Sequence, residues 1–284
     1  MKTASFLLAV LIVVNMAAPQ TGPAPQSQPG RRSPQAKTQQ EYKDYNADYA
    51  LSGGAVVEKA ADEFAARYPQ SELREYLYSK AMHEYQSENN PDKMLAMGEK
   101  VLALDPDNSI ALVLTATVLA DNLSDSDQNR DAKIAEIKKN ARRALETVDT
   151  GFTPPPNATP QQIEAYKNTL QSMAHSALGI MELKMADDTG AEKDLRTAAD
   201  LSKTQPDPYI WYHLALAQDH LATNARDEIQ KRRKYTEALA SVNQAIQFIG
   251  TNAELGRLAQ GERERLLKLA NSPPPPSGEA DKPK

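Results

Sequence analysis

Apolar residues recur along most of this chain at intervals of three and four, the spacing that places side chains on one face of an α-helix. Leu73, Leu77, Ala81 and Tyr85 form one such series. A longer series consists of Ile163, Tyr166, Leu170, Met173, Ala177 and Ile180. No stretch shows the sustained alternation of apolar and polar residues that is typical of a half-buried strand. The pattern therefore predicts an all-α fold.

Prolines and capping residues mark where these helices begin. Asn90-Pro91 and Asp207-Pro208 each place a capping side chain before a proline, which the first helical position tolerates. Thr159-x-x-Gln162, Thr189-x-x-Glu192 and Thr251-x-x-Glu254 fit the capping-box pattern, in which the two side chains satisfy each other's backbone N–H groups. We expect a helix to begin at each of these places.

The helical segments repeat. Trp211-x-x-Leu214-Ala215 has the same layout as Tyr78-x-x-Ala81-Met82, Leu112-x-x-Thr115-Ala116 and His175-x-x-Leu178-Gly179. The spacing is 34 residues from Met82 to Ala116 and 36 residues from Gly179 to Ala215. Small and apolar residues of a second helix follow three of these segments, as Ala141, Leu145 and Val148, as Ala191, Leu195 and Ala198, and as Ala238, Val242 and Ala245. A period of this length predicts stacked helix–turn–helix units.

At these residues the chain resembles the tetratricopeptide repeat family, whose first helix carries a large residue followed by Leu-Gly. Leu178-Gly179 keeps the Leu-Gly pair, and Trp211 keeps the large residue. The resemblance covers roughly residues 55–250 and implies a right-handed α-α superhelix of about four to five helix pairs. Relative to the family period, the loops near residues 121–133 and 222–232 are expected to be longer by about 13 and about 11 residues.

The ends of the repeat array can also be placed. The segment from Ala60 to Ser71 resembles a half-unit of bacterial envelope tetratricopeptide proteins. The charged, Leu-rich segment from Asn252 to Ala270 is expected to be a helix that caps the array. We therefore predict that the solenoid occupies residues 38–271. The series Tyr42, Tyr45 and Tyr49 precedes it with helical spacing and is interpreted as core packing rather than a binding stripe.

The N-terminus has the pattern of a secretory signal peptide. Lys2 precedes the apolar run from Phe6 to Val14, and small residues follow at Ala17 and Ala18. We predict a signal peptide over residues 1–18 and a periplasmic or secreted protein without stable membrane insertion after its removal; the alternative is an uncleaved anchor. Because the chain has no cysteine, it is not expected to be a lipoprotein.

Proline-rich segments flank and interrupt the helices. Residues 19–37 lack apolar periodicity and are predicted to be a disordered Pro/Gln-rich linker. Residues 272–284 contain four consecutive prolines and are predicted to be a disordered tail. Pro154, Pro155 and Pro156 form an internal break.

Composition removes several classes of function. With 33 Lys and Arg against 38 Asp and Glu, the net charge of −5 disfavours a nucleic-acid partner. The absence of cysteine excludes thiol nucleophiles, thiolate zinc sites and iron–sulfur ligation. His213 and His220 lie two helical turns apart with Asp219 nearby, but surface or packed histidines are the better interpretation. His83-Glu84 lacks the second histidine of a zinc-protease helix, because Ser87 stands there. We predict no catalytic residue, no metal site and no cofactor.

The resemblance also implies where a ligand binds, because the first helix of each pair lines the concave face in this family. The corresponding positions are Tyr76, Ser79, His83, Ile110, Val113, Thr117, Met173, Ser176, Ile180, Tyr209, Tyr212 and Leu216. They are mostly apolar or aromatic with a few hydroxyls, which suits an amphipathic helix or an extended peptide. Lys80 lies next to one such position, but no Asn accompanies it, so capture of a peptide C-terminus is disfavoured. The alternative is that part of this set is core between repeats.

These observations predict a non-enzymatic exported scaffold that binds a protein or peptide partner in the cell envelope. Two other classes remain open. One is an accessory module of an envelope or carbohydrate-processing complex, for which exposed aromatic side chains would be needed. The other is a structural helical spacer, whose groove would hold no ligand.

Overall fold

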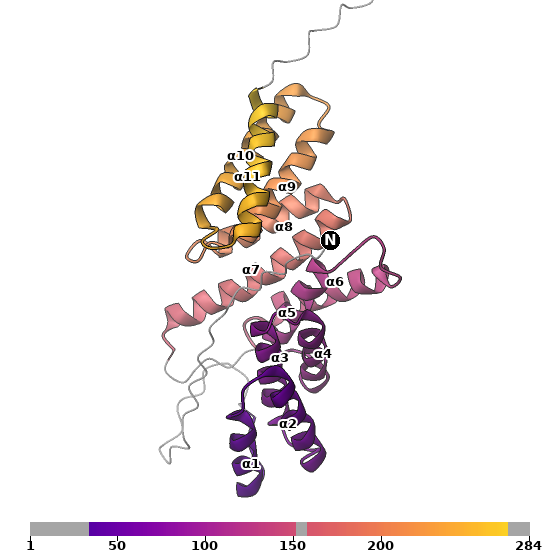
Figure 1. The fold of residues 1–284 in the computed structure, drawn as a ribbon, viewed down its shortest axis with the longest axis vertical. Helices are drawn as coiled ribbons and strands as arrows, with labels where there is room; N and C mark the ends of the chain where they lie inside the picture. Colours follow the sequence, from indigo (N-terminus) through magenta and orange to yellow (C-terminus); the bar gives the residue numbers. More distant parts are fainter. Residues whose placement is uncertain (1–33, 152–157, 272–284) are drawn as a thin grey trace, which may run out of the picture. The chain divides into compact units, whose positions relative to one another are not determined.

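The computed structural model describes residues 34–151 and 158–271, and within these ranges the chain is helical throughout, without strands. The helices are α1 (Gln39–Tyr49), α2 (Gly54–Arg67), α3 (Arg74–Ser87), α4 (Pro91–Leu104), α5 (Ser109–Asp121), α6 (Arg130–Thr147), α7 (Pro160–Lys184), α8 (Asp188–Leu201), α9 (Pro208–Asn224), α10 (Glu228–Phe248) and α11 (Ala253–Asn271) (Figure 1). The predicted all-α fold is confirmed. The predicted signal peptide 1–18, most of the predicted linker 19–37, the prolines 154–156 and the predicted tail 272–284 lie outside the described residues.

The helices form two compact units, the first up to Met181 and the second from Glu182. In the first unit α2 packs on α3, α3 on α4, α4 on α5 and α5 on α6, while α1 contacts α2 and α3. In the second unit α8 packs on α9, α9 on α10 and α10 on α11 (Figure 1). Packing between helices that follow one another in the chain is consistent with an α-helical solenoid.

Several predicted helix starts are confirmed by their capping contacts. The side chains of Asn90 and Asp207 accept hydrogen bonds from the backbone of the first turns of α4 and α9. The capping box of α7 forms in both directions, since the Thr159 N–H donates to Gln162 Oε1 at 2.8 Å and the Gln162 N–H donates to Thr159 Oγ1 at 3.3 Å. At the start of α1, Thr38 Oγ1 accepts from the Glu41 N–H at 3.1 Å.

Two predicted capping boxes are wrong. At α8 the cap is Asp187, whose Oδ1 accepts from the Gly190 N–H at 3.1 Å, and the helix has begun before Thr189. At α11 the side chain of Asn252 accepts from the Leu255 N–H at 3.0 Å, so Thr251 lies outside the helix. In both cases an Asp or Asn that caps equally well stands within two residues of the expected threonine, and the helix starts there.

The two expected long loops differ in the structure. Between α5 and α6 the connection covers residues 122–129, and α6 begins at Arg130. Between α9 and α10 it covers only residues 225–227, because α9 extends to Asn224 and α10 begins at Glu228. The additional residues near 222–232 therefore lengthen two helices and do not form a loop.

The core consists of small residues that let helices approach and larger residues that fill the space between them. Ala116 and Ala215 are fully buried, as their place in the repeat pattern predicts. Gly98 on α4 faces Thr115 on α5, and it is so close that a Cβ atom at position 98 would overlap the Thr115 methyl group. The absence of a side chain at Gly98 thus allows the close approach of α4 and α5.

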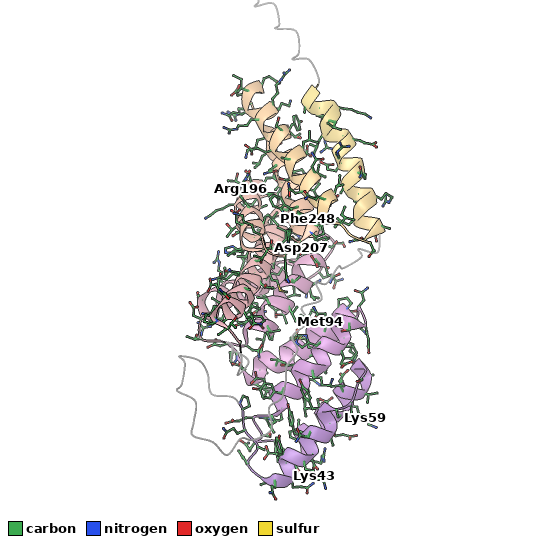
Figure 2. The ribbon with its side chains drawn as sticks, turned by 90° about the vertical axis from the view of Figure 1, so that its left-hand side faces the viewer. Lys43, Lys59, Met94, Arg196, Asp207 and Phe248 are labelled. Atoms are coloured by element: carbon green, nitrogen blue, oxygen red, sulfur yellow. The ribbon has the colours of Figure 1, made fainter. Side chains whose placement is uncertain are left out.

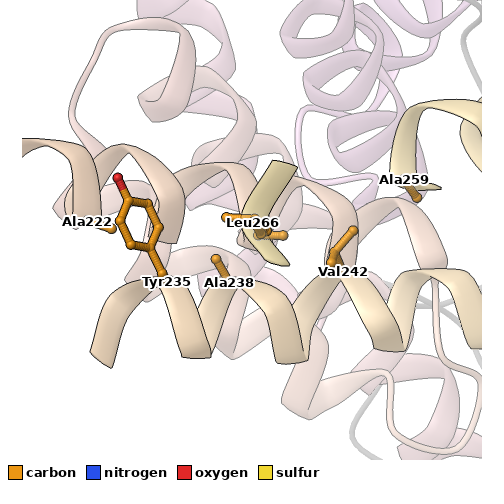
Figure 3. Close-up of a cluster of buried hydrophobic side chains, with 7 residues drawn as sticks. Ala222, Tyr235, Ala238, Val242, Ala259 and Leu266 are labelled. Carbon is orange, nitrogen blue, oxygen red and sulfur yellow. The ribbon is translucent and has the colours of Figure 1, made fainter. Parts of the chain in front are cut away.

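In the second unit one hydrophobic cluster joins α9, α10 and α11. It contains Ala215, Ala222, Tyr235, Ala238, Val242, Ala259 and Leu266 (Figure 3). Three of these residues are alanines from α9 and α10, and their small size allows the close approach of the two helices. The segment predicted to cap the array is therefore a helix whose apolar side completes the core of this unit.

The N-terminal tyrosine series divides between core and surface. Tyr45 is buried, and its ring lies 6.3 Å from that of Phe64 on α2. Tyr49 is half-buried, with the Lys80 ammonium 5.4 Å from its ring centroid. Tyr42 remains 42% exposed. The interpretation as core packing is confirmed for Tyr45, but Tyr42 lies at the surface.

Candidate functional site

On α3, the predicted groove residues Ser79 and His83 are half-buried. The His83 Nδ1 atom lies 3.2 Å from Gln86 Oε1, to which an Nδ1–H group donates, and burial lowers the pKa of His83. The neighbouring Lys80 pairs with Glu84 at 2.9 Å and stacks over Tyr49 of α1. Part of the α3 surface is therefore already occupied by α1.

On α5 and α7, the predicted residues divide between interior and surface. Val113 has no exposed surface and Ile180 is 2% exposed, so both belong to the packed interior rather than to an accessible face. Their burial corrects the assignment of these two positions to a groove. Thr117 and Ser176 are half-buried, and the buried hydroxyl oxygen of Thr117 has no hydrogen-bond partner among the described residues.

On α9, the predicted residues Tyr209, Tyr212 and Leu216 are all half-buried. Tyr209 and Tyr212 contact His213, whose ring centroid lies 4.3 Å from that of Tyr209 and 5.6 Å from that of Tyr212. The two rings meet the imidazole edge-on, a favourable arrangement for aromatic side chains. These four half-buried side chains form an aromatic and aliphatic group on α9, which we call the α9 surface; Tyr212 also packs against the hydrophobic cluster of α9, α10 and α11.

Burial controls the protonation of the α9 surface. It lowers the pKa of His213 to about 4, and the Nδ1–H group donates to the Tyr209 carbonyl at 2.9 Å. Burial also raises the pKa of Tyr212 and that of Asp207, the capping residue at the start of α9 (Figure 2). His213 is therefore neutral at physiological pH, and the α9 surface presents aromatic rings and an uncharged imidazole.

The second half of α9 contacts its neighbours through an ion pair and a hydrogen bond. Asp219 pairs with Arg265 of α11, which also contacts Glu262 at 2.8 Å. His220 Nδ1 lies 2.9 Å from the Asp188 carboxylate at the start of α8. His220 and Asp219, the pair weighed against a metal site, thus face partners on different helices.

A buried polar network links α8, α9 and α10. The Ser241 hydroxyl donates to Gln218 Oε1 at 2.7 Å, and the Lys234 ammonium lies 2.7 Å from both oxygens of Glu192. Burial opposes ionisation of Glu192, but the hydrogen bonds from Lys234 and Arg196 lower its pKa overall. This network fixes the orientation of α9 and thereby of the α9 surface.

Sequence reasoning missed a hollow in the first unit, between α4, α5 and α6. It has a volume of about 490 Å³, and its lining includes the exposed cations Lys139, Arg142 and Arg143. The only local signal is the basic stretch Lys138 to Arg143 on α6. Its acidic counterpart Asp107 lies 36 residues away along the chain, beyond the reach of helical periodicity.

The predicted groove residues therefore do not form one continuous surface within either unit. Ser79 and His83 lie on α3 in the first unit, and the accessible aromatic set lies on α9 in the second unit. In the described ranges, no cluster of three or more His, Asp or Glu side chains is arranged to hold a metal ion. No helix among these residues combines the length and the apolar composition needed to cross a bilayer.

No family model matches the chain, and no curated protein matches it either.

Proposed function

We propose that this protein is a non-catalytic, exported scaffold of the tetratricopeptide type that binds protein or peptide partners in the cell envelope. The repeat spacing of 34 and 36 residues and the consecutive packing of the helices support this fold assignment. We further propose that the helix pairs stack as a right-handed superhelix of about four to five pairs.

The observation that carries the proposal is the α9 surface. Tyr209, Tyr212 and Leu216 are partly accessible on one helix, and a neutral imidazole lies between the two rings. Covering apolar area contributes about 25 cal/mol per Å², and aromatic side chains offer more such area than any other type. A surface of this kind is suited to the apolar side of an amphipathic helix or to an extended peptide.

The test is recovery of partners from an envelope extract with the mature chain as bait, followed by a titration with the recovered protein. Tyr209→Ser combined with Leu216→Ser is expected to weaken binding about tenfold, since it removes two apolar contacts. The matched control is Tyr42→Ser combined with Leu51→Ser, which changes the same residue types at exposed positions of the first unit. Circular dichroism of both variants verifies that the helices remain folded.

Three outcomes would contradict this proposal. Equal binding by both double variants would remove the α9 surface from the interaction. Retention of the chain on cell-wall glycan, without a protein partner, would favour the accessory-module alternative. Recovery of no stoichiometric partner would favour a structural spacer.

The proposed location has its own test. If residues 1–18 are a signal peptide, the mature chain begins near Pro19 and is found outside the cytoplasm. Mass spectrometry of the N-terminal peptide from fractionated cells decides this point. Intact Met1 in a cytoplasmic pool would refute export.

A further inference from the structure

The hollow in the first unit combines an apolar inside with a charged edge. The buried side chain of Leu112 and the half-buried side chain of Leu102 line it together with Pro106. The exposed side chains of Lys139 and Arg142 lie at its edge, on successive turns of α6. A ligand at this place would meet aliphatic carbon and positive charge at once.

The carboxylates of the hollow are already engaged. Arg143 Nε and one terminal nitrogen lie 2.7 and 2.9 Å from the two oxygens of Asp107, and the other terminal nitrogen lies 3.2 Å from Glu146. Such a two-pronged contact is the strongest form of arginine–carboxylate pairing. Arg143 offsets one of the two negative charges of Asp107 and Glu146, so Lys139 and Arg142 give the lining of the hollow a net positive charge.

Three cations of α6 have no ion pair with any residue that the structure describes. Within the described ranges, neither Lys138 nor Lys139 nor Arg142 makes an ion pair or side-chain hydrogen bond. Cations of the preceding pair behave differently: Lys93 reaches Glu58 at 3.0 Å and Lys100 reaches Asp62 at 2.7 Å. In a chain with a net charge of −5, a group of unpaired cations beside a hollow favours an anionic ligand.

We propose that this hollow binds an acidic segment of a partner protein, with carboxylates on Lys139 and Arg142 and an aliphatic side chain against Leu102 and Leu112. The cations lie three positions apart on α6 and so share one side of the helix, which allows one segment to contact both. The proposal goes beyond the function proposed above, because the hollow shares no residue with the α9 surface.

The lining favours a peptide over a more highly charged polyanion. Asp107 and Glu146 place two carboxylates beside the cations, and these would repel the dense phosphates of a nucleic acid. The overall negative charge of the chain adds to this repulsion. A peptide carries fewer charges per length and supplies the aliphatic group that the inside of the hollow accommodates.

The experiment measures binding of fluorescent peptides to the full mature chain by anisotropy. The probe is a peptide of roughly twelve residues with alternating Glu and Leu, compared with a Gln/Leu peptide and a Glu/Ser peptide of equal length. We expect the Glu/Leu peptide to bind most tightly and its affinity to fall as the salt concentration rises.

Charge-reversal variants locate the site. Lys139→Glu combined with Arg142→Glu is expected to weaken binding of the Glu/Leu peptide at least about tenfold. The control variant combines Lys59→Glu with Lys203→Glu and makes the same change in net charge. Lys59 lies on α2 (Figure 2) and Lys203 in the connection between α8 and α9, and their side chains are 78% and 72% exposed. That control should change the affinity by less than about twofold.

Several results would overturn the proposal. Equal loss of affinity in both double variants would show that only the overall charge matters. Equally tight binding of the Gln/Leu peptide would show that the cations play no part, and equally tight binding of the Glu/Ser peptide would show the same for the apolar lining. Absence of binding to the wild-type chain would refute the site. Tighter binding of duplex DNA or of phosphatidylglycerol vesicles, lost in the α6 variant alone, would assign the cations to a different class of ligand. None of these results depends on the α9 surface.

Discussion

Replacing Gly98 by alanine should destabilise the first unit, although alanine is the better helix former. A Cβ atom at position 98 would lie well under 3.0 Å from Cγ2 of Thr115 on the neighbouring helix. Thr115 cannot easily turn away, because its hydroxyl donates to the Ala111 carbonyl at 2.7 Å and accepts from Asn140 Nδ2 at 3.1 Å. The added methyl group must therefore either separate α4 from α5 or break a buried hydrogen bond.

The size of the effect follows from two opposing terms. Overpacking costs about 1–3 kcal/mol, and the helix propensity of alanine returns up to about 1 kcal/mol. We expect Gly98→Ala to lower the free energy of unfolding by about 1–2 kcal/mol, which corresponds to a fall in Tm of about 2–8 °C. Thermal and urea melts followed by circular dichroism measure both quantities.

A double-mutant cycle identifies the clash as the cause. Thr115→Ser removes Cγ2 but keeps the hydroxyl, so Gly98→Ala should cost at least about 1 kcal/mol less in that background. The matched control is Gly261→Ala on α11, where a Cβ atom meets no other atom within 4 Å and the substitution should stabilise by about 0.5–1 kcal/mol. The reasoning fails if Gly98→Ala stabilises as Gly261→Ala does, or if the two changes at 98 and 115 are additive.

Four further substitutions test the assignment of buried groups. In urea melts, Val113→Ser should lower the free energy of unfolding by about 1–3 kcal/mol. Thr117→Val should raise it by about 1 kcal/mol, because it removes a buried hydroxyl with no hydrogen-bond partner among the described residues. A stabilising Val113→Ser together with a destabilising Thr117→Val would contradict the burial of these positions. The pKa of His213 is about 4 in the folded chain, so as the pH falls the unfolded chain takes up a proton at this residue first. The free energy of unfolding should therefore decrease by about 1–3 kcal/mol between about pH 6.5 and pH 4. In melts at pH 7 and 4.5, His213→Gln should make this decrease smaller. Lys234→Met should cost about 1–3 kcal/mol, because the partly buried Glu192 carboxylate loses its Lys234 contacts and keeps the one to Arg196; an unchanged Tm would show that the Lys234–Glu192 pair is not needed.

The positions of the helices could be predicted from the sequence where they depend on residues of a single helix. Apolar periodicity and the Asn90-Pro91 and Asp207-Pro208 pairs locate helices because they depend only on neighbouring residues. The capping residue was harder to predict where two candidates lie within two residues of each other. Asp187 precedes Thr189 and Asn252 follows Thr251, and only the folded backbone selects the residue that caps.

The candidate site was less predictable because burial depends on other helices. Val113 and Thr117 are one turn apart on α5, yet neighbouring helices leave Val113 wholly buried and Thr117 half-buried. The hollow was missed for a similar reason. The pairing of Arg143 with Asp107 joins α6 to the connection before α5, and the spacing of residues within one helix does not predict such a contact.

The long pair α9 and α10 shows how an array of this kind can change its dimensions. With 17 and 21 residues against 14 in both α3 and α4, the two helices are longer by three and seven residues, about one and two turns at 3.6 residues per turn. The added turns keep the apolar side in place, and Ala222 and Tyr235 pack together near the extended end (Figure 3). A gain or loss of a single residue would instead rotate every later side chain by about 100°. Length variation in such a chain is therefore quantised: helix pairs can grow or shrink by whole turns while the adjoining pairs keep their contacts.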